Sequence, residues 1–164
     1  MNIQHLTLQR RIATPLGPLT AARSAAGLAG LWFDGQKHHP GDLDVPEDDG
    51  RDPVLSATEA ALTAYFAGQP FTMPPLDPAG TEFQRAVWQA LLDIQAGASD
   101  TYGQLAERLG RAQAARALGA AVGRNPISIL IPCHRVVGAD GSLTGYAGGL
   151  DRKRALLKLE GCAA

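Results

Sequence analysis

Residues 130–137 read Leu130-Ile131-Pro132-Cys133-His134-Arg135-Val136-Val137, which puts a thiol, an imidazole and a guanidinium in consecutive positions after an apolar run. A cysteine reacts as its thiolate and needs a nearby base or cation to form one near neutral pH. His134 can take the proton or carry the positive charge, so this stretch is the candidate reactive centre. The alternative for such a pair is that Cys133 is only a buried small hydrophobic residue.

The composition is that of a small globular protein. A chain of 164 residues with 45% hydrophobic content can build one moderate core or two small ones. The two cysteines, Cys133 and Cys162, lie in different contexts, which suits unpaired thiols in a reducing compartment. No apolar run follows Arg10 and Arg11, and none elsewhere approaches the length of a membrane helix. We therefore expect a cytoplasmic protein without membrane contact.

Prolines crowd the segment 69–80, which therefore cannot form a regular helix and is the predicted linker. We expect two domains, residues 1–75 and residues 80–164. In the first, short strands are predicted at 6–14, 19–24 and 28–33, followed by a helix to about Phe66. Ser56-Ala57-Thr58-Glu59 has the pattern of a capping box that opens this helix. The acidic run 42–52 is most simply a solvated loop.

The second domain is predicted to be mainly helical. Thr81 with Gln84 opens one helix, and Thr101 with Gln104 opens another that stops at Gly110. Further helices are expected at 112–123 and at about 151–160. Two helices separated by a glycine make a plausible helix-turn-helix.

Charge is divided between the two halves. Residues 1–79 carry 9 acidic and 5 basic side chains, whereas residues 80–164 carry 7 acidic and 10 basic ones. The half with the Cys-His pair thus has a net charge of +3, which favours phosphate contacts, although ordinary solvated surface charge is the alternative. The helix at 112–123 is nearly all alanine and glycine, with Arg116 as one of few long side chains. Such a helix either approaches DNA closely or packs tightly on another helix.

The second half of the chain resembles the O6-alkylguanine-DNA alkyltransferases, the single-use DNA repair proteins. The matching segments are 83–85, 101–104, 114–119, 125–138, 141–150, 152–154 and 160–161, whereas the first half matches mostly at 14–19. The resemblance implies an α+β (α/β) protein: a small N-terminal β-meander and helix domain that is ribonuclease H-like, then a mainly helical C-terminal domain with a winged helix-turn-helix-like motif.

The resemblance also implies a reaction. Cys133 takes an alkyl group, typically methyl, from O6-alkylguanine in one irreversible turnover, with O4-alkylthymine as a further candidate substrate. His134 acts as base through a water, and Glu160 orients the imidazole. Asn125 has the position of a hinge, although Asn before Pro is also an ordinary turn signal. Tyr102 crowds the target phosphate and donates to the base, or alternatively packs between helices.

The implied partner is double-stranded DNA, bound through the minor groove by a monomer that flips the damaged nucleotide out of the stack. Arg116 would fill the gap left by the base. The other implied DNA contacts are Ala115, Gln84, Arg111 and Arg124. The base pocket would use carbonyls of Cys133 and Val136, the N–H of Ala147, and the side chains of Tyr102, Tyr146 and Lys153.

Departures from the family pattern bear on cofactors and specificity. Some relatives bind zinc in the N-terminal domain, but that domain has no cysteine here and only His5, His38 and His39, so we predict no metal and no cofactor. Ser128 and Thr144 replace residues common in relatives and alter the pocket wall. Two other functions stay open: a lesion-binding module without transfer, which the motif cysteine disfavours, and a hydrolytic or redox enzyme that uses the Cys-His pair.

Overall fold

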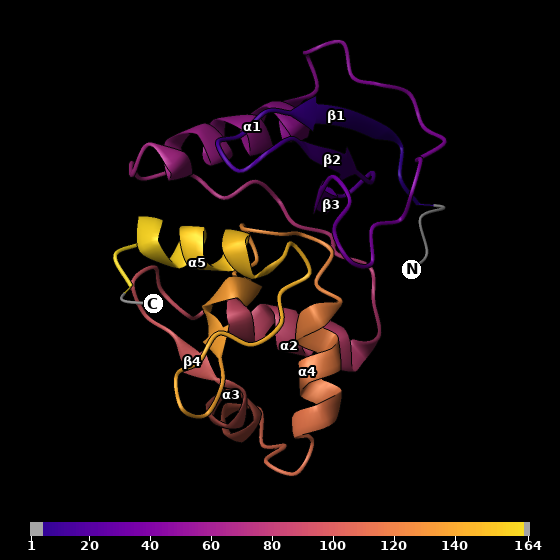
Figure 1. The fold of residues 1–164 in the computed structure, drawn as a ribbon. Helices are drawn as coiled ribbons and strands as arrows, with labels where there is room; N and C mark the ends of the chain where they lie inside the picture. The colour runs from indigo at the N-terminus through magenta and orange to yellow at the C-terminus, as the bar shows by residue number, and fades with distance from the viewer. Residues whose placement is uncertain (1–4, 163–164) are drawn as a thin grey trace. The chain divides into compact units, whose positions relative to one another are not determined.

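A computed structural model describes residues 5–162 of the chain, which divides into two compact units, residues 1–79 and residues 80–164. The first unit is a three-stranded antiparallel meander, β1-β2-β3, with one helix, α1 (Figure 1). Its strands are β1 Leu8–Ile12, β2 Leu19–Arg23 and β3 Leu28–Phe33, and its helix is α1 Pro53–Phe66. Leu55 and Leu62 of α1 are almost fully buried, so the helix and the sheet share one small core.

The acidic loop of the first unit departs from the sequence-based interpretation. Asp48 is not solvated: its side chain is only 2% exposed and pairs with Arg10, whose Nε donates to Asp48 Oδ2 over 2.7 Å. Backbone bonds from Gln9 to Pro46 and from Asp48 to Gln9 attach the loop to the edge of β1. The prediction of a solvated loop therefore holds for Asp42, Asp44, Glu47 and Asp49, which are exposed, and was wrong at Asp48, because composition alone does not reveal a cation on the neighbouring strand.

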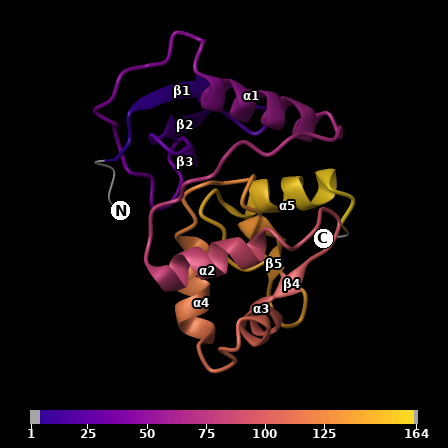
Figure 2. The same cartoon turned by 180° about the vertical axis from the view of Figure 1, so that it is seen from behind.

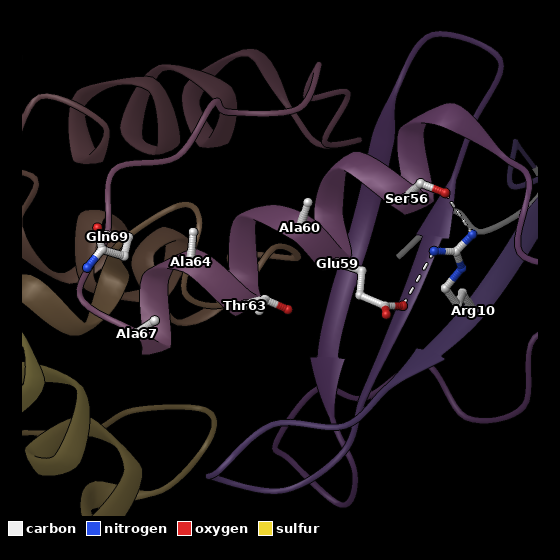
Figure 3. Close-up of a pocket in the computed structure, with 8 residues that line it drawn as sticks. All are labelled: Arg10, Ser56, Glu59, Ala60, Thr63, Ala64, Ala67 and Gln69. Carbon is white, nitrogen blue, oxygen red and sulfur yellow. Dashed lines mark hydrogen bonds and ion pairs between the residues drawn. The ribbon is translucent and has the colours of Figure 1, made fainter.

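Helix α1 begins at Pro53, three residues before the predicted capping box. Asp52 is its N-cap and accepts from Leu55 N over 2.9 Å, and the proline at the first helical position suits a helix start. Ser56 lies inside the first turn and accepts from Arg10 Nη2 over 3.0 Å (Figure 3). The Ser56 capping-box prediction was wrong because Asp52-Pro53 is the stronger start signal.

Asp52→Ala is expected to lower the free energy of unfolding by about 1 to 2 kcal/mol, since it removes the cap of α1. It also removes the partner of Arg23 Nη1, which lies 2.8 Å from Asp52 Oδ1. Urea unfolding of the variant measures the loss. Asp42→Ala, an exposed aspartate of the same loop, is the matched control and should change stability little; equal losses in both variants would contradict the capping role.

Beside α1 lies a hollow of about 620 Å³ lined by Arg10, Glu59, Thr63 and Gln69, among others (Figure 3). Arg10 is engaged there by Asp48, Ser56 and Glu59. Its lining contains no thiol and no imidazole, so the hollow does not hold the Cys-His pair that the sequence indicates.

The second unit is mainly helical with a small parallel pair of strands. Its elements are α2 Glu82–Leu91, β4 Asp100–Thr101, α3 Tyr102–Arg108, α4 Ala115–Gly123, the short 3₁₀ turn η1 Cys133–Arg135, β5 Val136–Val137 and α5 Leu150–Leu159. Strand β5 pairs with β4, as Figure 2 shows. This division into a sheet unit and a helical unit confirms the predicted α+β class.

Both capping boxes predicted in this unit are confirmed. The Thr81 hydroxyl accepts from Gln84 N, and the Gln84 side chain accepts from Thr81 N; Thr101 and Gln104 repeat the arrangement at α3. The helix predicted at 112–123 starts only at Ala115, because residues 111–114 form a turn closed by Ala114 N and Arg111 O. No side chain caps α4.

Helix α4 is fixed to α2 through Trp88. The Trp88 indole is 2% exposed and its Nε1 donates to the carbonyl of Ala121 over 2.8 Å. Leu118, Ala121 and Val122 form the buried face of α4. The opposite face is left open to solvent, which decides what the helix can contact. Within residues 5–162, no helix is both long enough and apolar enough to span a membrane.

Candidate active site

The backbone that leads to Cys133 is irregular, buried and held by one side chain. Asn125 is 5% exposed; its Nδ2 donates to Ile127 O over 3.2 Å and to Ile131 O over 2.8 Å, and its Oδ1 accepts from Ile127 N over 3.0 Å. Inside the loop so closed, Ile129 has a φ of +70°, which is strained for a β-branched residue. Asn125 therefore holds a backbone that no regular element supports.

Cys133 begins η1 directly after this loop, and its side chain is almost covered. The residue is 7% exposed, and burial raises the pKa of its thiol, while a hydrogen bond from Asn125 and the charge of Lys153 act in the opposite direction. The free protein therefore holds Cys133 mainly as the neutral thiol. A base must take its proton before the sulfur can act as a nucleophile.

His134 is completely buried beside it, and its Nε2 lies 2.7 Å from Glu160 Oε2. Glu160 is the C-cap residue of α5 and its side chain is 2% exposed. Burial lowers the pKa of His134, and the Glu160 carboxylate partly offsets this. A neutral imidazole that donates from Nε2 keeps its Nδ1 lone pair available, and Nδ1 has no hydrogen-bond partner among the described residues.

Lys153 is hydrogen-bonded to several backbone carbonyls that surround the site. It is fully buried, and its Nζ donates to the carbonyls of Val136, Thr144 and Gly145 over 2.6, 3.2 and 3.3 Å. Burial lowers the pKa of this lysine, and proximity to Cys133 raises it. The ammonium thus joins α5, β5 and the loop 138–149 at one point.

Two tyrosines line the same region. The Tyr146 ring meets the His134 ring edge to face, with centroids 6.4 Å apart. Tyr102, the first residue of α3, accepts a long hydrogen bond of 3.4 Å from the Thr144 hydroxyl. Ala147 directly follows Tyr146 in the loop that leads to α5 and is half-buried. Asn125 and Lys153 thus interact with Cys133, and Glu160 and Tyr146 contact His134, whereas Tyr102 is linked to the site through Thr144.

The residues predicted to contact DNA lie on α2, on the turn before α4 and along α4. Ala115 and Arg116 lie exposed in the first turn of α4, and Arg124 is exposed at its C-cap. Arg111 is exposed and its guanidinium lies 5.6 Å from the centroid of the Phe83 ring. Gln84, by contrast, uses its side-chain oxygen to cap α2.

One residue of the site had no role in the sequence analysis. Arg135 directs its guanidinium at Glu160, with Nε–Oε1 and Nη2–Oε2 distances of 2.8 and 3.0 Å. Its place next to His134 was the only available signal, and the partner lies 25 residues further along the chain. Among the residues that the model describes, no three His, Cys, Asp or Glu side chains gather as a metal site.

Comparisons with known proteins agree with this geometry. Residues 82–162 match the family model described as 6-O-methylguanine DNA methyltransferase, DNA binding domain, and residues 8–77 match the ribonuclease-like domain of the same family. The chain is 47% identical over 152 residues to the methylated-DNA–protein-cysteine methyltransferase of Mycobacterium tuberculosis, covering 92% of this chain and 90% of that protein. The protein of the same name from Methanosarcina acetivorans is 45% identical, with coverages of 90% and 94%.

A solved structure extends the similarity to the fold. Mycobacterium tuberculosis OGT in complex with DNA superposes with a TM-score of 0.85 at 46% identity, covering 94% of this chain and 92% of that one.

Proposed function

Because the chain belongs to the 6-O-methylguanine DNA methyltransferase family, we propose that Cys133 is the residue to which it transfers the alkyl group. The chain is a DNA-binding repair protein that reverses alkylation directly, by transfer to its own cysteine. Of its two cysteines, only Cys133 stands beside a buried imidazole that a carboxylate orients. That arrangement is the observation that carries the proposal.

The reaction begins with proton removal from a thiol that burial keeps neutral. His134 takes this proton at Nδ1 through a water, while Glu160 holds Nε2–H and balances the charge that develops on the ring. The sulfur then attacks the alkyl carbon, an S–C bond forms, and the C–O bond breaks with its electrons going to guanine O6. The backbone N–H of Ala147 serves as the donor that stabilises this oxygen.

Substrate access requires the damaged nucleotide to leave the stack, since O6 is otherwise inside the duplex. We place this step at the minor groove, with α4 as the inserted helix and the protein acting as a monomer. The open face of α4 supports this, because Ala115, Ala117 and Ala120 are exposed and let the backbone approach closely. Tyr102 would then hold the rotated nucleotide, and Arg116 would fill the space that it leaves in the stack.

Product formation should stop at one methyl group per protein molecule. A thioether offers neither water nor another thiol an easy route to regenerate the nucleophile. Titrating a fixed amount of protein with excess O6-methylguanine duplex should therefore give a plateau equal to the amount of active protein. Peptide mapping should find one added methylene on the peptide with Cys133 and none on Cys162.

Cys162→Ser is the matched control and should reach the same plateau, since Cys162 lies beyond α5 and outside the Pro-Cys-His-Arg motif. Sustained multiple turnover, or repair with Cys133 unmodified, would overturn the proposal and favour a hydrolytic or redox enzyme.

A further inference from the structure

Arg135 connects three separate parts of the second unit. Its side chain is 12% exposed and belongs to the last residue of η1. The guanidinium donates twice to Glu160 at the end of α5, over 2.8 and 3.0 Å, and its Nη1 donates to the carbonyl of Ile94, three residues beyond α2. A planar fork of this kind fixes a carboxylate in position and in rotation, which a single hydrogen bond does not.

The Glu160 carboxylate is divided between two partners. Oε2 accepts from His134 Nε2 over 2.7 Å and from Arg135 Nη2 over 3.0 Å, while Oε1 accepts from Arg135 Nε. At 2% exposure an ionised carboxylate is costly unless a cation compensates its charge. Arg135 provides that charge in every protonation state of His134, which favours the ionised form of the Glu160 carboxylate.

Several charged or polar groups face His134. Glu160 lies at the end of α5, Arg135 on the same turn as His134, Lys153 on α5, and the Tyr146 ring on the loop 138–149. Glu160 raises the pKa of His134, whereas Arg135 and Lys153 lower it, in addition to burial. Arg135 therefore acts on the imidazole in two ways: by its own charge, and by its hold on the carboxylate.

We propose that Arg135 is a positioning residue, which holds ionised Glu160 with Oε2 aimed at His134 Nε2 and so keeps Nδ1 of a neutral imidazole available to the Cys133 proton. This inference rests on the proposed function, because it concerns the base of that reaction. Its consequence is a pH window: without Arg135, His134 holds its proton to higher pH, and the acid side of the activity profile moves upward.

The test is the single-turnover rate of methyl transfer from an O6-methylguanine duplex, at saturating protein, from pH 5.5 to 9. The pH profile of this rate should rise on its acid side, the acid limb, to a maximal rate, the plateau rate. Arg135→Gln should lower the plateau rate about 10-fold or more. It should also move the acid limb to higher pH by about one unit, as expected for loss of a charge within a few ångströms. Arg135→Lys keeps the positive charge but loses the two-pronged hydrogen bonding of the guanidinium. The acid limb of this variant should stay near that of wild type, while its plateau rate falls.

Glu160→Gln separates action through the carboxylate from a structural effect. If Arg135 acts through Glu160, then Arg135→Gln should lower the plateau rate much less in the Glu160→Gln variant than it does in wild type. Lys158→Gln, an exposed cation on α5, is the matched control for loss of one positive charge and should leave limb and plateau unchanged. Thermal melting of every variant identifies losses that follow from unfolding.

An acid limb of Arg135→Gln that coincides with wild type, or plateau losses that multiply in the double variant, would overturn the positioning role. These outcomes differ from failure of the proposed function, in which wild-type protein itself transfers no methyl group to Cys133.

Discussion

Cys133→Ala and Cys133→Ser are expected to abolish methyl transfer, with no product above background after any time, while binding to a methylated duplex persists. In the proposed reaction the Cys133 thiol forms the new bond, and a serine hydroxyl is too weak a nucleophile to replace it. Under the proposed mode of binding, α4 and the exposed arginines make the phosphate contacts, so binding does not require the thiol. Both substitutions should therefore abolish methyl transfer without changing the affinity for the duplex.

Two measurements check this. Transfer is followed by the radioactivity of a labelled methyl group that moves from DNA to protein, and binding by the fluorescence anisotropy of a labelled duplex. Cys162→Ser supplies the control for removal of a thiol. Appreciable transfer by Cys133→Ala would remove Cys133 from its role, and loss of binding in both Cys133 variants would mean that the substitution damages the fold.

Local sequence rules predicted the elements whose signals lie within a few residues of each other. The boxes Thr81–Gln84 and Thr101–Gln104 were correct because each is a closed exchange of hydrogen bonds within one turn. The strand 28–33 was predicted at its observed bounds, since turn signals flank it. The prediction failed at α1, where Asp52-Pro53 and Ser56 compete as start signals and Asp52-Pro53 is the stronger.

The site itself was only partly accessible from sequence. Cys133 and His134 are adjacent, and their motif is specific, but the 2.7 Å contact between His134 and Glu160 joins residues 26 apart. The Arg135 fork and the three carbonyls on Lys153 are tertiary facts of the same kind. Such contacts depend on how α5 packs against η1, which no local pattern encodes. Asn125 is intermediate: Asn before Pro signals a turn, but not that its amide closes a loop around Ile129.

Burial raises the pKa of the Cys133 thiol and lowers the pKa of His134, so both side chains are held in their neutral forms. A buried thiol that stays protonated is protected from other electrophiles, and a neutral imidazole is ready to accept its proton. We therefore expect the nucleophile to form mainly when a flipped base fills the pocket. In the proposed mechanism the reaction depends on nucleotide rotation as much as on the thiol, and α4 is the element proposed to support that rotation.

Arg116→Ala is expected to slow repair of an O6-methylguanine duplex roughly 100-fold at saturating protein, since holding a base outside the stack costs a few kcal/mol. Arg116 is an exposed long side chain in the first turn of α4, among alanines too short to fill the space that a rotated base leaves. Reaction with the free alkylated base requires no rotation, so its rate should stay near that of wild type.

The ratio of the two rates, duplex over free base, is the quantity to measure, because it cancels any general damage to the Cys133 centre. Arg124→Ala is the matched control, since Arg124 is an equally exposed arginine at the other end of α4. Its loss should weaken binding to methylated and unmodified duplex alike, in a salt-dependent manner, and leave the ratio of saturated rates unchanged. Equal losses on duplex and free base in Arg116→Ala would reject the proposal that this side chain replaces the flipped base.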